Sequence, residues 1–179
     1  MSCFILKPLI NLEKVINLSC EAFPAFATNG RRQPGRLVQL NASTGGAGPL
    51  PIITTLLANP INVVDVTIDA SGMRNPVVLL TFTSVVCLPV GISVTLNFEI
   101  RRSTNGGSPV NIGPTNTFST LVTALEAESF SFQYFDNNLA PGVYTYSIQL
   151  STNSIIDVTP GLTVNNATLS ALAVDNDIF

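Results

Sequence analysis

Few side chains in this chain could carry out chemistry, because it contains no histidine and only three cysteines. Without histidine, the Ser-His and Cys-His nucleophile arrangements are excluded, and so is the usual general base near neutral pH. Three cysteines without histidine do not complete a tetrahedral zinc site. The glycines at 45, 46 and 48 lack the lysine and helix that follow a phosphate-binding loop. The sequence therefore predicts a protein that is not an enzyme and has no cofactor.

Carboxylates are the remaining acid–base groups. Glu126 and Glu128 would share one face of a strand, whereas a glycosidase needs two carboxylates across a cleft, so we predict a solvated strand edge here. Calcium takes about six to eight oxygen ligands, and no dense acidic loop supplies them. The sequence predicts no metal site, but it leaves calcium binding open at two sets of residues: Asp65 with Asp69, and Asp136 with Asn137 and Asn138.

The cysteines are Cys3, Cys20 and Cys87. Because the count is odd, either one thiol stays free or bonds form between chains. In a reducing compartment all three could instead be small buried apolar side chains. Cys3 and Cys20 bracket the first twenty residues, and Cys87 lies near the middle of the rest. This placement favours inter-subunit disulfides that join an N-terminal arm to a neighbouring subunit.

Residues 1–20 are apolar and form the predicted arm. A helix over residues 9–18 is an alternative, since Leu9, Leu12 and Ile16 have helical spacing and Pro8 suits a first helical turn. We prefer a strand, in which alternate side chains share one face. We expect this face to be buried in a neighbouring subunit, and its residues are Phe4, Leu6, Ile10, Leu12, Ile16 and Leu18.

The arm does not read as a secretory signal, because Lys7, Pro8, Glu13 and Lys14 interrupt it and no small-residue cleavage site follows. No window of about 18 apolar residues exists, so no membrane span is predicted. If the protein reaches the cell exterior, we expect it to do so without a signal peptide, for example by release of the contents of the cell that made it.

Only 11% of the residues are charged, against about a quarter in ordinary soluble domains, while 46% are hydrophobic. Such a chain either buries much of its surface against other subunits or has a neutral Ser/Thr/Asn surface. The pairs Arg31–Arg32 and Arg101–Arg102 are isolated and the net charge is −3, so no nucleic-acid partner is predicted.

Residues 36–174 alternate between apolar and polar in short segments that turn residues separate, and residues 92–102 show the strongest alternation. About eight strands at this spacing predict an all-β antiparallel sandwich, or jelly roll. Aromatic residues alternate at Phe130, Phe132 and Tyr134 and at Tyr144 and Tyr146, which is typical of a sandwich core and less so of a sugar-stacking face. The predicted organisation is an arm at 1–20, a linker or crossing segment at 21–35, the β-sandwich at 36–174 and a tail at 175–179.

These features resemble the endospore appendage (Ena) subunits and other spore-surface jelly-roll structural proteins of endospore-forming bacteria. The shared elements are the Cys3 arm, the paired-strand segment 77–102 (VVLLTFTSVVCLPVGISVTLNFEIRR) and the closing strand 165–174 (NNATLSALAV). The resemblance implies one jelly-roll domain after a cysteine-bearing connector, made in the mother cell and assembled on the spore. This chain departs from the group in having single rather than adjacent cysteines, so the resemblance does not supply the cross-linking scheme.

The sequence thus predicts a structural protein that self-assembles into a fibre or appendage. Copies would join head to tail, each inserting its arm into a neighbour, with other spore-coat or exosporium proteins as further candidate partners. An alternative is a closed, trimeric jelly-roll spore-surface protein or a carbohydrate-binding module, in which the arm is an anchor or tail. The lack of tryptophan disfavours the sugar-binding alternative.

Overall fold

Strands follow one another along the part of the chain that the computed structural model describes, which is residues 38–50, 59–89, 93–121, 126–152 and 161–176. Each strand lies where apolar and polar residues alternate, because alternation lets a strand bury one face. No helix in these residues has the length and apolar character needed to cross a membrane. In chain order the strands are β1 (Val38–Ala47), β2 (Ile61–Asp69), β3 (Pro76–Leu88), β4 (Ser93–Thr104), β5 (Val110–Leu121), β6 (Glu126–Asp136), β7 (Val143–Thr152) and β8 (Thr163–Asp175).

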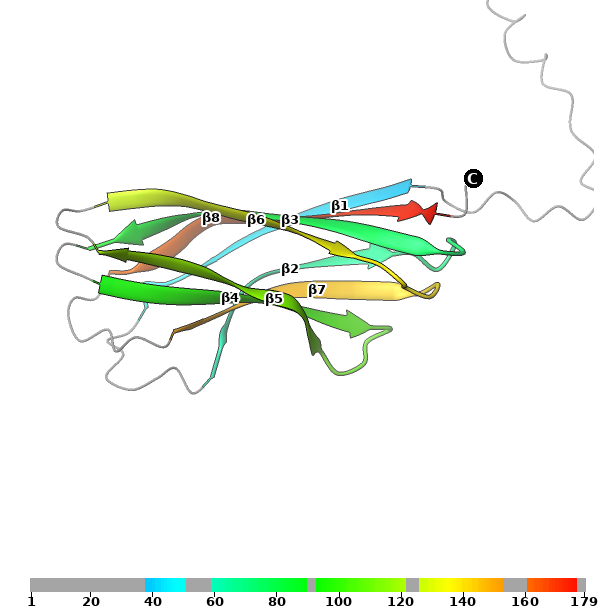
Figure 1. Cartoon of the computed structure of the whole chain (residues 1–179), viewed down its shortest axis with the longest axis horizontal. Helices are drawn as coiled ribbons and strands as arrows, with labels where there is room; N and C mark the ends of the chain where they lie inside the picture. The colour runs from blue at the N-terminus through cyan, green and yellow to red at the C-terminus, as the bar shows by residue number, and fades with distance from the viewer. Residues whose placement is uncertain (1–37, 51–58, 90–92, 122–125, 153–160, 177–179) are drawn as a thin grey trace, which may run out of the picture. The chain divides into compact units, whose positions relative to one another are not determined.

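The strands form two four-stranded antiparallel sheets, with the orders β1-β8-β3-β6 and β2-β7-β4-β5 (Figure 1). First pairs with last and the pattern continues inward: β1 with β8, β2 with β7, β3 with β6 and β4 with β5. This nested pairing defines a jelly roll. The predicted all-β jelly-roll sandwich is therefore confirmed.

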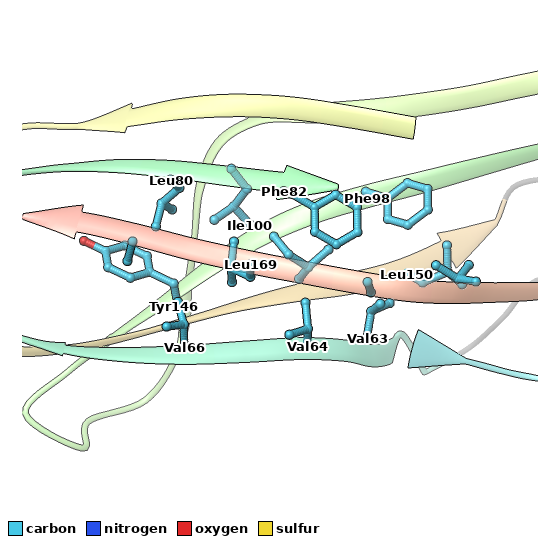
Figure 2. Close-up of a cluster of buried hydrophobic side chains, with 14 of the residues drawn as sticks. Val63, Val64, Val66, Leu80, Phe82, Phe98, Ile100, Tyr146, Leu150 and Leu169 are labelled. Atoms are coloured by element: carbon cyan, nitrogen blue, oxygen red, sulfur yellow. The ribbon is translucent and has the colours of Figure 1, made fainter. Parts of the chain in front are cut away.

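The core lies between the two sheets, and most of the strands contribute alternate side chains to it (Figure 2). Phe82 of β3 and Phe98 of β4 meet at its centre, with ring centroids 5.7 Å apart. Around them pack aliphatic side chains from both sheets, among them Leu80, Ile100 and Leu150, all almost fully buried. Burial of apolar side chains between the two sheets is the main favourable contribution to the free energy of folding.

β1 runs on through residues 43–47, although the glycines there are typical of a flexible loop. Glycine is needed here for close approach and not for a turn. A Cβ atom at Gly45 would collide with the carbonyl oxygen of Val63 on β2. Gly45 therefore lets the edge strands of the two sheets come together.

Two further strand ends are defined by their neighbours, and one of them differs from the predicted organisation. β3 continues through Cys87 to Leu88, because Cys87 pairs with Ala127 on one side and Thr163 on the other. Asp175, which the sequence places in a tail, is the last residue of β8. Its buried carboxylate accepts hydrogen bonds from the backbone nitrogens of Arg74 and Asn75, both at 3.0 Å, and so fixes the turn before β3.

Candidate functional site

Two sides of the sandwich differ in how closely the sheets approach. On one side β1 and β2 are in contact, and Asn41 Nδ2 donates to the carbonyl oxygen of Thr67 at 2.7 Å. On the other side are β5 and β6, each the last strand of its sheet. Among the described strands neither has a hydrogen-bonded neighbour on that side, so each presents a row of unpaired backbone groups.

Aromatic side chains line the β5–β6 side from within. Phe130, Phe132 and Tyr134 of β6 point into the sandwich but are only half-buried, whereas Phe82 on the neighbouring strand is fully buried. Phe130 packs on Phe98, with centroids 4.8 Å apart, and edge-on against Phe118 of β5 at 5.7 Å. These aromatics belong to the core, as the sequence predicted. Their exposed parts are apolar area that a further strand could cover.

An ion pair joins the sheets at one end of this side. Arg102 Nη1 of β4 lies 2.9 Å from both carboxylate oxygens of Asp136 of β6, and Tyr146 Oη donates to Asp136 Oδ2 at 2.9 Å. The Tyr144 hydroxyl donates to the carbonyl oxygen of Ala140. Arg102 occupies a core-facing position in the alternation of β4. The sequence prediction did not use this position as a signal.

The pKa shifts in the cluster around Asp136, at Arg102, Tyr144 and Tyr146, have structural causes. Burial raises the pKa of Tyr146 far above its ordinary value, and the Asp136 charge raises it further. Burial also raises the pKa of Tyr144. For Arg102, burial lowers the pKa but the hydrogen bond and charge of Asp136 more than offset it, so the net shift is upward. Both tyrosines stay neutral and Arg102 stays charged near pH 7, so the cluster joins the two sheets by an ion pair and hydrogen bonds.

The carboxylates considered as calcium ligands have partners within the chain. Asp65 Oδ1 accepts from Asn62 Nδ2 at 2.9 Å, and Asp69 Oδ1 accepts from the Ser71 hydroxyl at 2.6 Å. Asp136 is engaged by Arg102. Over the described ranges, no three metal-ligating side chains form a group that could hold an ion. Glu128 lies half-buried near the start of β6.

The outer face of the β1-β8-β3-β6 sheet has an apolar end that the sequence prediction missed. The strand register places Leu40, Leu172, Leu79 and Phe135 in one row across all four strands, and all four point away from the core. Val38, Val174 and Val77 form the next row. Exposure reaches 57% for Val38, 68% for Leu40 and 54% for Phe135. We call these seven residues the outer apolar patch: Val38, Leu40, Val77, Leu79, Phe135, Leu172 and Val174.

Outside the patch, most outward residues of the two sheets are polar, although Val85 and Ala127 also lie on the outer face of the first sheet. On the same sheet, the row formed by Thr44, Thr168, Thr83 and Ser131 lies beyond the patch. On the other sheet, the outward residues whose side chains are described are mostly Asp, Thr, Ser, Gln, Glu, Arg and Asn, with Val143 as an apolar residue among them. A solvated sheet face is ordinarily polar, so this patch is a candidate contact surface. Its sequence signal is the apolar run at 77–80, which occupies both faces of β3.

Cys87 lies on this same outer face, at the opposite end of β3 from the patch. Its thiol is free and partly exposed, and Asn165 Nδ2 approaches Sγ at 3.4 Å. The Cys87 side chain is thus half-buried and not fully enclosed. Cys3, Cys20 and all six residues of the predicted arm face (Phe4, Leu6, Ile10, Leu12, Ile16 and Leu18) lie outside the described residues.

Comparison with known proteins gives a family and a fold. The family model for a domain of unknown function, DUF4489, matches residues 37–174. No curated protein matches the chain. Two similar solved structures come from infectious bursal disease virus: the Gx strain, with 11% identity and a TM-score of 0.52 over 81% of this chain, and the Gt strain, with 12% and 0.50 over 88%. This chain spans 34% and 39% of those chains, and at such identity the likeness concerns the fold alone.

Proposed function

Since the chain belongs to the DUF4489 family, a domain of unknown function, we propose its function from its own surfaces: it is a structural subunit that self-assembles by inserting its N-terminal arm into a neighbouring copy. The observation that carries the proposal is the β5–β6 side, with two unpaired strand edges and half-buried aromatics between them. An added strand would pair with a free edge through backbone hydrogen bonds.

The arm has the composition that this role requires. As a strand, it places six apolar side chains on one face. Burying six such side chains would stabilise the contact by on the order of 10 kcal/mol before ordering costs are subtracted. Insertion of one copy's arm into the next is a head-to-tail contact, which yields an open fibre unless the rotation closes a ring.

Disulfides would make this contact hard to reverse. The partly exposed thiol of Cys87 supports a bond to Cys3 or Cys20 of a neighbouring copy. Such bonds would form outside a reducing cell. The resemblance to endospore appendage subunits supports assembly on a spore surface after synthesis in the mother cell, beside other coat or exosporium proteins.

Electron microscopy of the full chain, with and without reductant, tests the proposal. We expect fibres from the full chain and soluble monomers after deletion of residues 1–20. A matched pair of arm variants sharpens the test. Leu12→Asn with Ile16→Asn should abolish fibres, because both lie on the predicted strand face. Leu9→Asn with Val15→Asn, on the opposite face, should leave them intact.

Each contrary outcome has a defined meaning. Undiminished fibres after deletion of residues 1–20 would refute the role of the arm. Loss of fibres with Leu9→Asn would favour the helical arm. A discrete trimer that survives the deletion, measured by light scattering, would support the closed jelly-roll alternative instead of the fibre.

A further inference from the structure

The outer apolar patch belongs to a sheet face without charged side chains. Among the described strand residues of β1, β8, β3 and β6, no Asp, Glu, Lys or Arg points outward. The outer face of the other sheet differs, because Asp65, Asp69, Glu99 and Arg101 point outward there. Charged residues are common on solvated surfaces and depleted at the centre of interfaces. The patch and the neutral face around it therefore indicate a partner that is itself neutral and partly apolar.

A second copy of this chain offers such a surface, because it can present the same face. In a two-fold symmetric contact each face meets itself, so a charge on it would lie against a like charge and weaken the contact. The outer face of the β1-β8-β3-β6 sheet avoids this cost, whereas Asp65, Asp69 and Glu99 would make the other outer face repel its own copy. Twisted sheets pack face to face about 10 Å apart, with strand directions within about 30° of each other.

The size of the patch sets the strength of such a contact. Four strands about 4.8 Å apart, with two rows of side chains about 7 Å apart, cover roughly 250 Å² on each copy. A row of neutral side chains borders the patch: Ala42, Ser170, Thr81 and Gln133. With this row as a polar rim, two copies would bury roughly 750 Å² in total, against about 1,200–2,000 Å² in stable complexes. Two free copies should therefore pair only weakly.

We propose that the outer apolar patch of one copy packs against the same patch of a second copy, with Leu172 and Leu79 of the two central strands in the middle of the contact. The pair goes beyond the proposed assembly, because it uses a different face and does not involve the arm. In a fibre, each further contact would form at an effective concentration of the order of mM or higher. A contact too weak to hold two free copies can then join two fibres side by side, a consequence that rests on the proposed function.

Nuclear magnetic resonance over a dilution series from millimolar to micromolar protein measures the pair. The full chain is kept reduced and carries Leu12→Asn with Ile16→Asn, which remove the arm contact. We expect the amide signals of Leu79, Leu172 and Phe135 to shift with concentration. The amide signals of Thr67 and Thr145, on the outer face of the other sheet, should stay unchanged.

Two charge variants of β1 localise the contact. Leu40→Asp lies in the patch and Thr44→Asp lies two rows further along the same face; both side chains are exposed, and each variant adds one negative charge. Leu40→Asp should raise the dissociation constant of the pair about tenfold or more, because it places an unpaired charge in an apolar contact. Thr44→Asp should raise it by about threefold or less. Equal effects, or signals that do not change up to millimolar protein, would overturn the proposal.

Mixing the variants tests whether the patch meets itself. When a labelled Leu40→Asp chain is titrated with the chain that lacks this change, the mixed pair should also be weakened, because every contact contains both patches. If the patch instead bound a different surface of the second copy, that surface of Leu40→Asp would still bind an intact patch at full strength. Mixed pairs of undiminished affinity would therefore overturn the proposal.

Electron microscopy of chains with an intact arm separates this inference from the assembly itself. Fibres of the unmodified chain should lie side by side, and Leu40→Asp should give single fibres of the same length. Fibres that stay single in the unmodified chain, or that bundle equally with Leu40→Asp, would overturn the patch contact. If no fibres form but the concentration-dependent pair persists and Leu40→Asp weakens it, the assembly proposal alone fails.

Discussion

Arg102 of β4 and Asp136 of β6 form an ion pair between the two sheets on the β5–β6 side, with Nη1 2.9 Å from both carboxylate oxygens. The Asp136 side chain is nearly buried, at 6% exposure, while that of Arg102 retains 24%. Since β5 and β6 share no backbone hydrogen bonds, side-chain contacts of this kind hold the two sheets together here.

We predict that Arg102→Met destabilises the domain by about 2–4 kcal/mol, because it leaves a buried carboxylate without its cation, and the partial exposure of Arg102 lowers the cost from that of a fully buried pair. Urea unfolding measures the change. Arg101→Met is the matched control: its guanidinium lies on the outer face, bonded to Gln149 Oε1 at 3.1 Å, and we expect about 1 kcal/mol or less. Equal destabilisation by the two variants would argue against the Arg102–Asp136 ion pair as a contact that holds the sheets together.

Alkaline pH should weaken the domain through Tyr146. Its pKa is raised in the folded state, so the neutral form stabilises the fold fully below the ordinary value of 10.0. Above that pH the unfolded chain loses a proton that the folded chain keeps, and the free energy of unfolding therefore falls. Urea midpoints from pH 8 to about 11 measure this. A slope that Tyr146→Phe leaves unchanged would assign the effect to other groups.

Gly113 should tolerate no side chain. Its φ is +69°, and a Cβ atom would lie 2.5 Å from Cε2 of Tyr134, where β5 approaches β6. Gly113→Ala should cost about 2–3 kcal/mol, from both backbone strain and the collision. Gly106 isolates the first term, since its φ is +74° with no atom within 4 Å of the added carbon. Gly106→Ala should cost only about 1 kcal/mol. If the two variants lose a similar amount of stability in thermal unfolding, the Tyr134 ring moves aside from the added carbon at little cost.

The Cys87 thiol should react without unfolding. In a chain with Cys3→Ser and Cys20→Ser, we expect complete modification by a disulfide reagent under native conditions, because the side chain is partly exposed on the outer face. Absorbance of the released thiolate follows the reaction. Modification only in denaturant would remove Cys87 as a partner for inter-subunit disulfides.

Local patterns sufficed to predict the strands, because each buries alternate residues of its own sequence. Residues 92–102 predicted β4 closely for that reason. β1 was harder, since Gly45 and Gly46 are typical of a loop until β2 is known to pass beside them. The nested pairing that distinguishes a jelly roll from other sandwiches depends on register between distant residues, such as Gln39 with Ala173.

The candidate surfaces also combine features that local sequence patterns indicate with features that depend on distant pairing. Arg102 could have been identified, because it follows Phe98 and Ile100 on the inward phase of its strand, but its partner Asp136 depends on how the sheets face each other. The patch required the register of four strands, although Val77 and Leu79 signalled it by being apolar on the outward phase. The arm residues and Cys3 and Cys20 stay predictions.

The pairing of β1 with β8 also governs the order of folding. Among the described strands, β1 has only β8 as a neighbour in its sheet, and β8 ends at Asp175, so β1 must wait for a strand that is made much later. Contacts so distant in sequence make folding slow, on the millisecond-to-second scale of high-contact-order domains. During synthesis β1 and its exposed Leu40 therefore stay unpaired, and a chain truncated before β8 should be a target for aggregation and not a competent building block.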